Sequence, residues 1–290
     1  PWRVDAVPFR GVSHRHAALF FWSYLDRSVN IPFLTFPMTS TKTRAESLKG
    51  ETLLITGANR GIGRVLLDHA LDRGAERVYA AVRRPSAADP LVARHGDRVR
   101  ILPLDLTDSA SIQRAAEQAT DVTIVINNGG IFLPGSALSP EAPRTLNQLM
   151  DVNVNGLIAM AQAFAPVLKA NGGGVFVQLN SIVSMKTFPD FALYSASKAA
   201  SYAITQGLSL SLAEQGTRVI SLHPGPIATD MGDAAGLTAV AEPPAVVAEA
   251  LVQALEGNGL HVFPDTMARQ IGDAYDSFAN AVVEAGLMEA

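Results

Sequence analysis

The sequence contains no cysteine, and only 17% of its 290 residues are charged. Without cysteine there can be no disulfide framework, no thiolate metal site and no cysteine nucleophile. The absence fits a reducing compartment, and we expect the cytoplasm. The formal net charge of -4 provides no basic surface for nucleic acid. The six histidines show paired metal-ligand spacing only at His14 and His16, so we expect neither a nucleic-acid partner nor a metal.

Long hydrophobic runs are also lacking in the first 37 residues, which differ in composition from the rest. The longest apolar run there, Ala17–Trp22, is far shorter than the roughly 20 residues that cross a membrane, so no membrane partner is expected. The segment carries four arginines and two aspartates. This basic composition is compatible with a transit peptide, but Met38 resembles a natural start and favours an upstream extension. We expect residues 1–45 to be an atypical, poorly ordered extension.

From Glu51 onward, strand patterns alternate with helical patterns. Apolar runs predict strands at 52–56, 77–82, 99–104, 122–126, 174–180, 217–222 and 260–263. Helical periodicity fills 62–73, 108–119, 144–169, 192–214, 244–256 and 267–285. This alternation predicts a doubly wound α/β fold, a parallel sheet with helices on both faces. We expect it to form a single domain over residues 46–290, with ligands at the carboxyl edge of the sheet.

The stretch Thr56–Gly63, TGANRGIG, joins the first predicted strand to the first predicted helix. Glycine lacks Cβ, so the backbone can turn tightly and its amides can approach a pyrophosphate. The helix N-terminus that follows adds favourable partial positive charge. The pattern is typical of a dinucleotide-binding corner, although a tight turn that binds nothing would also use these glycines.

The second predicted strand is followed by Arg83 and Arg84, without the acidic residue that would bind a ribose 2′-hydroxyl. Arginine at this corner suits a 2′-phosphate, which a carboxylate would repel. Arg60 in the glycine turn could add a further positive charge. The alternative is solvated surface arginines, but the pattern favours NADP(H) over NAD(H). Asp105, after the third strand, could bond an adenine amino group or only form a turn.

Tyr194 and Lys198 lie four residues apart and are predicted to share one helix face. A phenol normally titrates near about 10. A neighbouring ammonium would lower that pKa and suit the phenol to proton transfer near neutrality. Ser181, at the end of a predicted strand, could donate to a substrate oxygen. A tyrosine and a lysine at this spacing also occur by chance on ordinary helices.

Together with Asn127–Gly130 and Pro224-Gly225, these motifs occur in the order and spacing of the short-chain dehydrogenase/reductase family. The resemblance covers about residues 46–266. It implies a Rossmann-like fold and hydride transfer between a nicotinamide and a carbonyl carbon, without metal. Members commonly pair two long helices, so the resemblance also implies a homodimer or homotetramer.

The resemblance assigns roles to four side chains. Tyr194 would donate or accept the proton on the substrate oxygen, and Lys198 would lower its pKa and bind the nicotinamide ribose. Ser181 would orient the carbonyl. Asn153 would hold a water in the proton relay.

The predicted cofactor contacts follow from the same match: Gly57, Asn59, Arg60, Gly61, Ile62, Gly63, Arg83, Arg84, Asp105, Leu106, Asn127, Gly129, Tyr194, Lys198, Pro224, Gly225, Ile227 and Thr229. A mostly apolar set is expected to line the substrate pocket: Ile131, Phe132, Leu133, Ile182, Val183, Phe188, Phe191 and Met231. Such a pocket favours a moderately hydrophobic ketone or aldehyde.

Three positions depart from the family pattern. Gly129 stands where the family usually has alanine, and Asn180 precedes Ser181 where another serine is common. The segment 228–243 is short and rich in alanine and glycine, and we expect it to be a mobile lid over the substrate. His223 could be a second acid-base group, but we expect it to pack under the cofactor.

We therefore predict an NADP(H)-dependent oxidoreductase that reduces the carbonyl of a small-molecule ketone or aldehyde. A 3-ketoacyl-thioester reductase is the enzymatic alternative, and it should present a basic patch at the pocket mouth for an acyl carrier. An alternative of another class is a protein that senses NADP(H) without turnover.

Overall fold

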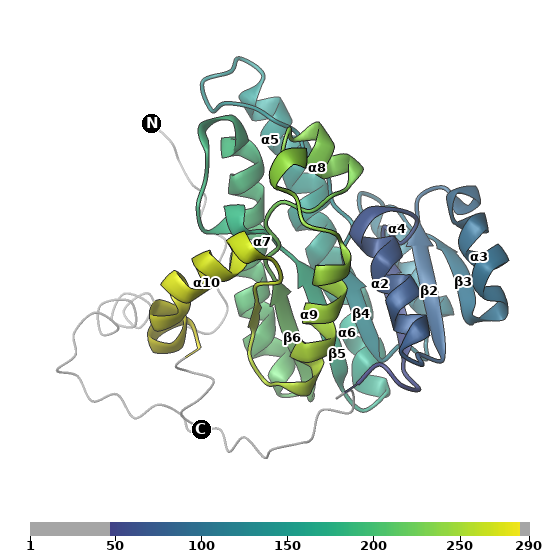
Figure 1. The fold of residues 1–290 in the computed structure, drawn as a ribbon. Helices are drawn as coiled ribbons and strands as arrows, with labels where there is room; N and C mark the ends of the chain where they lie inside the picture. Colours follow the sequence, from purple (N-terminus) through teal and green to yellow (C-terminus); the bar gives the residue numbers. More distant parts are fainter. Residues whose placement is uncertain (1–46, 285–290) are drawn as a thin grey trace, which may run out of the picture. The chain divides into compact units, whose positions relative to one another are not determined.

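The computed structural model describes residues 47–284, so the extension predicted for residues 1–45 lies outside the described part. Seven strands form one sheet in the order β3-β2-β1-β4-β5-β6-β7, and every neighbouring pair is parallel. The strands are β1 (Thr52–Thr56), β2 (Arg77–Val82), β3 (Val99–Pro103), β4 (Ile124–Asn127), β5 (Gly174–Leu179), β6 (Thr217–Leu222) and β7 (His261–Val262). Figure 1 shows the sheet between layers of helices, as the doubly wound α/β prediction requires.

Nine α-helices connect or follow these strands among residues 47–284: α2 (Gly61–Asp72), α3 (Asp89–His95), α4 (Ser109–Gln118), α5 (Ala142–Met150), α6 (Gly156–Ala170), α7 (Ala192–Ala213), α8 (Asp230–Ala234), α9 (Ala245–Glu256) and α10 (Thr266–Phe278). Short 3-10 turns occupy Pro85–Ala88, Gly96–Arg98, Ile182–Ser184, Pro189–Phe191 and Thr238–Val240, and π-helical turns occupy Asp151–Asn155 and Ala279–Val283. In the described part of the chain, no helix is both long and apolar enough to cross a bilayer.

Two apolar cores lie on the two faces of the sheet because strand side chains alternate in direction. On β1, Leu53 and Ile55 belong to the core that contains the buried faces of α2 and α9. Leu54 between them belongs to the opposite core, with residues of α4, α6 and α7. The strands are therefore apolar on both sides, which is why their sequences read as continuous hydrophobic runs.

The helix predicted over 144–169 is interrupted. It consists of α5 and α6 joined by the π-helical turn, in which the N–H of Gly156 donates to the carbonyl of Asp151. A Cβ on Gly156 would lie 2.9 Å from Cβ of Leu106, so glycine permits close packing here. The one extra residue in the turn shifts the helix phase locally. Asn153 lies in this turn, and hydrophobic periodicity alone does not reveal it.

The strand order places β1 and β4 side by side at the centre of the sheet, where the connections change direction. The loops that leave their carboxyl ends diverge at this point and open a crevice. The chain enters that crevice at Gly57 after β1 and at Asn128 after β4. The predicted ligand edge of the sheet therefore coincides with a cleft of about 840 Å³.

Candidate active site

One cleft of about 840 Å³ runs along the carboxyl edge of the sheet. At one end it is bounded by the glycine turn between β1 and α2. Gly57 and Gly61 adopt positive φ angles of 67° and 53°. A Cβ on Gly63 would lie 2.4 Å from the carbonyl oxygen of Gly57, so only glycine allows the helix to start this close to the strand. No side chain caps the first N–H groups of α2, which leaves them available to a phosphate group.

The glycine turn is held from behind by the end of β4. The hydroxyl of Thr56 donates to Oδ1 of Asn127 at 3.1 Å and accepts from the N–H of Gly129 at 2.8 Å. Asn128 donates from Nδ2 to the carbonyl of Thr56 at 2.8 Å. A Cβ on Gly129 would lie 3.0 Å from Cδ1 of Leu106 and 3.2 Å from that hydroxyl. Glycine at position 129, where the family usually has alanine, therefore avoids a Cβ that would crowd Leu106 and Thr56.

Two of the predicted cofactor residues do not line the cleft. Asn127 is buried, and its Nδ2 donates to Oε1 of Gln178 at 2.7 Å, beneath the turn. Gly63 also lies behind the surface of the cleft. Both therefore support the glycine turn from inside. The lining residue at this point is Asn128, the second asparagine of the motif, which the sequence analysis passed over.

Three arginines lie along the same end of the cleft. Arg83 and Arg84 follow β2, and among residues 47–284 neither guanidinium forms a hydrogen bond or an ion pair with another side chain. Arg60, in the glycine turn, pairs with Asp230 at 3.0 Å. The charge at this end is therefore positive, as the prediction of a 2′-phosphate site requires.

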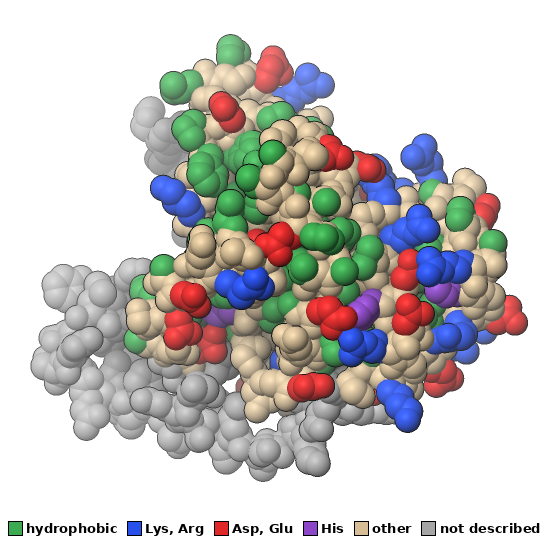
Figure 2. Space-filling view, viewed as in Figure 1, with side chains coloured by type: hydrophobic (Ala, Val, Ile, Leu, Met, Phe, Trp, Pro, Cys, Tyr) green, Lys and Arg blue, Asp and Glu red, His purple; other side chains and the backbone are tan. Residues whose placement is uncertain are grey.

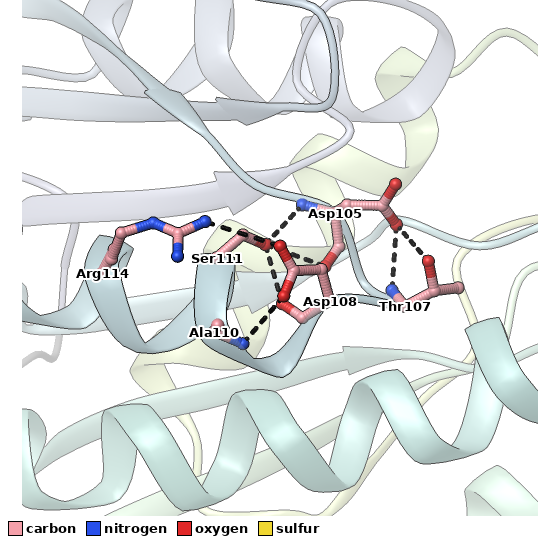
Figure 3. A network of polar contacts seen from close by, with 6 residues as sticks. All are labelled: Asp105, Thr107, Asp108, Ala110, Ser111 and Arg114. Carbon is pink, nitrogen blue, oxygen red and sulfur yellow. Dashed lines mark hydrogen bonds and ion pairs between the residues drawn. The ribbon is translucent and has the colours of Figure 1, made fainter.

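Asp105 lines the cleft, as Arg83 does, and Figure 3 shows the polar network to which Asp105 belongs. Its Oδ1 accepts from the N–H and the hydroxyl of Thr107, at 2.9 and 2.8 Å. Those hydrogen bonds and the charge of Arg83 hold the pKa of Asp105 below its ordinary value. Asp108 caps α4 by accepting from Ala110 N at 3.0 Å. Asp105 therefore forms the turn and also lines the cleft, and its contact with an adenine amino group stays a prediction.

Tyr194 and Lys198 project from the first turns of α7 into the middle of the cleft. Nζ of Lys198 donates to the carbonyl of Leu179 at 2.8 Å and lies 5.9 Å from the centre of the Tyr194 ring. Burial lowers the pKa of Lys198 to about 8 and raises the pKa of Tyr194. The lowering of the Tyr194 pKa that we expected from Lys198 is not found, because burial raises that pKa instead.

Ser181 follows β5 and also lines the cleft. Its hydroxyl donates to the carbonyl of Pro224 at 3.2 Å and accepts from the N–H of Val183 at 3.3 Å. The adjacent Asn180 also lines the cleft, and its side-chain amide donates to Thr205 at 3.2 Å and to Ser221 at 2.8 Å inside the protein. Asn180 thus adds a buried polar anchor behind the site.

Asn153 is buried and does not line the cleft. Its Oδ1 accepts from Ile131 N at 2.9 Å, and its Nδ2 donates to Ile131 O and to Ser197 Oγ, both at 3.1 Å. A Cβ on Gly130 would lie 3.0 Å from that Oδ1 and 3.9 Å from Nζ of Lys198. Oδ1 of Asn153 and Nζ of Lys198 therefore both face the small space beside Gly130.

The sequence pattern of the family described as short chain dehydrogenase matches residues 51–238. The chain belongs to this family. It is 29% identical to an uncharacterized oxidoreductase of Staphylococcus aureus over 219 residues, which cover 72% of this chain and 92% of that protein.

Solved short-chain dehydrogenases share the fold. One from Burkholderia cenocepacia, in complex with NADP, has a TM-score of 0.72 and 35% identity and covers 84% of this chain and 100% of that one. A 3-ketoacyl-(acyl-carrier-protein) reductase from Brucella melitensis, complexed with NADH, has a TM-score of 0.68 and 27% identity and covers 74% of this chain and 96% of that one.

The far end of the cleft in this short-chain dehydrogenase is aromatic. The ring of Phe132 packs edge-on against Phe191 and Tyr194, with centroids 5.3 and 5.1 Å apart, and Phe188 packs edge-on against Phe191 at 6.3 Å. All seven other expected pocket residues line the cleft, but Leu133 packs instead with Leu149. Figure 2 shows hydrophobic side chains gathered beside α8 in this region.

Several lining residues escaped the sequence analysis because they belong to no recognised motif: Thr107, Val152, Asp190, Asp230, Leu237 and Met267. His223, by contrast, is buried outside the cleft and stacks on Phe263 at 5.3 Å. Burial lowers its pKa to about 3, so it is a neutral packing residue rather than a second acid-base group.

The segment 228–243 folds as α8 and a 3-10 turn. The ends of this segment are joined by a hydrogen bond from Ala228 N to Glu242 O at 2.8 Å.

Proposed function

We propose that this short-chain dehydrogenase is an NADP(H)-dependent oxidoreductase that reduces a ketone or aldehyde to an alcohol. One observation carries the proposal: a single cleft joins the glycine turn and its arginines to Ser181, Tyr194 and Lys198, and continues into an aromatic pocket. Each part alone could have a purely structural role. Hydride transfer to a carbonyl needs all of them in one cavity, because cofactor and substrate must meet at one point.

The residues present fit a dinucleotide with a 2′-phosphate. The uncapped start of α2 and the crowded Gly63 give a phosphate close access to backbone N–H groups. Arg83 and Arg84 would hold the 2′-phosphate, and the carboxylate of Asp105 would accept from an adenine amino group. NADPH, when bound, supplies the hydride that a carbonyl carbon accepts. The NADP-bound relative from Burkholderia cenocepacia supports this choice, although the Brucella melitensis relative binds NADH.

The protein supplies the proton. Because burial raises the pKa of Tyr194, the phenol is protonated at neutral pH and can give its proton to the carbonyl oxygen as that oxygen gains negative charge. Its hydroxyl forms no hydrogen bond with another described residue and is therefore open to a substrate. Ser181 would donate a second hydrogen bond to the same oxygen. Stabilisation of a developing oxyanion by two placed donors is a large catalytic contribution.

Lys198 and Asn153 would replace the proton that Tyr194 gives up. A charged Nζ favours the phenolate that remains after transfer. Nζ of Lys198 and Oδ1 of Asn153 both face the space beside Gly130, where a water would link them in a relay. We also propose that Lys198 contacts the nicotinamide ribose. A protein that only senses the cofactor would have no use for this arrangement.

The charge of the pocket favours a neutral substrate over an acyl-carrier thioester. The three arginines that line the cleft lie at its cofactor end, together with Asp105 and Asp230. The other charged groups among the described lining residues are Asp190 and Lys198, and Lys198 already donates to Leu179. The described lining therefore places no basic patch at the aromatic end, where a phosphopantetheine carrier would enter. The 3-ketoacyl-thioester reductase remains the second candidate on the ground of the Brucella melitensis relative alone.

NADPH oxidation across a panel of aryl ketones, alkyl ketones, aldehydes and acetoacetyl thioesters tests the proposal, with NADH in parallel. We expect turnover with NADPH on apolar ketones or aldehydes. Turnover confined to thioesters would replace the proposal with the second candidate, and tight binding without turnover on any compound would favour a sensor.

Two further proposals concern the protein in the cell. We propose a homodimer or homotetramer that pairs the α5–α6 segment and α7 of two copies, and Leu210 on α7, which is 55% exposed, offers an apolar contact. We also propose a cytoplasmic location, which suits a chain without cysteine. Light scattering and fractionation of cells that express the full chain test these two proposals.

A further inference from the structure

An ion pair joins the two sides of the cleft near its positive end. NH1 of Arg60 lies 3.0 Å from Oδ2 of Asp230, although the two residues are 170 positions apart in the sequence. Arg60 is the last residue before α2, and Asp230 is the first residue of α8. Their side chains are 67% and 75% exposed, and acidic and basic side chains meet on this part of the surface in Figure 2.

The fold brings these residues together because the start of α8 rests on the glycine turn. Thr229 caps α8 by accepting from Gly232 N at 3.2 Å. Its methyl group would lie 3.3 Å from a Cβ on Gly61. Arg60 and Asp230 both line the cleft that also contains Arg83 and Arg84. The pair is thus part of the same surface as the proposed phosphate site.

The three arginines of this surface differ in whether they form an ion pair. Within residues 47–284, Arg83 and Arg84 have no ion pair, whereas Arg60 is paired with Asp230. A carboxylate at this place neutralises one of three guanidinium groups and stands close to where an anionic dinucleotide would bind. Like charges disfavour each other, and a phosphate and a carboxylate that need the same guanidinium compete for it.

We propose that Asp230 is a specificity-determining residue, which competes with the 2′-phosphate of NADP(H) for Arg60 and so limits the preference for NADP(H) over NAD(H). This inference rests on the proposed cofactor. In the free protein Arg60 bonds Asp230. With a 2′-phosphate present, Arg60 exchanges the carboxylate for the doubly charged phosphate, and Asp230 returns to solvent. A ligand without that phosphate leaves the pair in place.

The two classes of ligand differ by one group, which makes the exchange measurable without turnover. Adenosine 2′,5′-bisphosphate and adenosine 5′-monophosphate differ only in the 2′-phosphate and contain no nicotinamide. Calorimetric titration of the full chain with both nucleotides, and with NADPH and NADH, yields four dissociation constants. Asp230→Asn keeps the size of the side chain and removes its charge.

We expect Asp230→Asn to tighten binding of NADPH and the bisphosphate by about threefold to fivefold at low salt, the range of an exposed ion pair. Binding of NADH and the monophosphate should change by less than about half of that factor. The gain should shrink at about 0.5 M salt because exposed charges are screened. Asp233→Asn is the matched control, because Asp233 lies on the same helix, bonds Thr238 at 2.7 Å and does not line the cleft.

The variant Arg60→Gln shows whether Asp230 acts through Arg60. In that background Asp230→Asn should no longer favour ligands with a 2′-phosphate. Weaker NADPH binding by Asp230→Asn would mean that Asp230 positions Arg60 for the phosphate, and an equal gain for all four ligands would mean a general charge effect; either result overturns the inference. If the wild-type protein prefers NADPH and Asp230→Asn changes nothing, this inference alone fails. If the wild-type protein has no preference for ligands with a 2′-phosphate, the proposed cofactor fails as well.

Discussion

Nζ of Lys198 donates to the carbonyl oxygen of Leu179, 2.8 Å away, so α7 is bonded directly to the last residue of β5. The ammonium lies 5.9 Å from the centre of the Tyr194 ring. This bond fixes the lysine at the carboxyl edge of the sheet. It also stabilises the charged form of the Lys198 ammonium, whose pKa burial lowers. Burial moves the two pKa values of the pair apart, since it lowers that of Lys198 and raises that of Tyr194.

The pH dependence of reduction follows from these directions. Lys198 has a pKa of about 8, so it is charged below that pH and neutral above it. Because its charge favours the phenolate that remains after proton transfer, kcat for carbonyl reduction should be level below pH 8 and fall above it. A pH profile of kcat at saturating NADPH measures this. A rate that rises between pH 8 and 10 would contradict the assigned roles.

The arginines after β2 should distinguish the two cofactors. Replacing both Arg83 and Arg84 by alanine should weaken NADPH binding by at least about a hundredfold, because two charge-assisted hydrogen bonds to a phosphate contribute about 1.5–3 kcal/mol each. NADH binding should change by less than about threefold. Fluorescence titration measures both. Arg94→Ala, which removes an exposed arginine paired with Asp68, is the control, and an equal loss for both cofactors would show that these arginines do not contact the phosphate.

The glycine turn should tolerate no Cβ at Gly63. Alanine there would place Cβ 2.4 Å from the carbonyl oxygen of Gly57, and we expect a loss of about 1–3 kcal/mol in the free energy of unfolding, together with weaker NADPH binding. Gly207→Ala is the matched control in α7, where nothing lies within 4 Å of the added atom. It should stabilise the protein by about 0.5–1 kcal/mol. Urea unfolding of both variants tests the pair, and an unaffected Gly63→Ala would refute the close approach.

Asn180 should act on stability rather than on the cofactor. Its amide donates to Thr205 and Ser221 and accepts from Ser201 at 2.7 Å, all beneath the cleft. Asn180→Ala leaves these buried hydroxyls with one partner fewer and should lower the free energy of unfolding by about 1–3 kcal/mol. The dissociation constant of NADPH should stay within about twofold. A weakened NADPH complex at unchanged stability would place the amide in the binding site.

The fold and the cofactor end of the cleft were predictable because they depend on local chemistry. A strand that is buried on both faces appears in the sequence as a continuous apolar run. Glycine marks a tight turn before a helix because it lacks Cβ and can adopt positive φ angles. The α/β architecture emerged in this way, whereas most of the cofactor residues, from Gly57 to Thr229, were predicted from the resemblance to the short-chain dehydrogenase/reductase family. Leu133 was assigned to the pocket on apolarity alone, which does not distinguish a residue that faces a cavity from one that packs beside Leu149.

The remaining features of the site depend on the phase of a helix or strand and on contacts between residues that are far apart in the sequence. The π-helical turn at Asn153 adds one residue to a helix without changing the hydrophobic pattern. Asn127 and Asn128 are adjacent in one motif, yet only Asn128 lines the cleft, because strand side chains alternate at the end of β4. Asp230 is an ordinary acidic residue until α8 places it 3.0 Å from Arg60. The raised pKa of Tyr194 likewise depends on burial that only the folded chain provides.

Proton donation by Tyr194 is the central claim, and Tyr194→Phe tests it most directly. The ring packs edge-on against Phe132 without using its hydroxyl, so the variant should keep the fold, its melting temperature and an NADPH dissociation constant within about twofold. With a ketone that the wild-type enzyme reduces, kcat should fall by about a hundredfold to ten-thousandfold, the usual contribution of a placed general acid. Undiminished NADPH oxidation by a folded Tyr194→Phe protein would contradict the account.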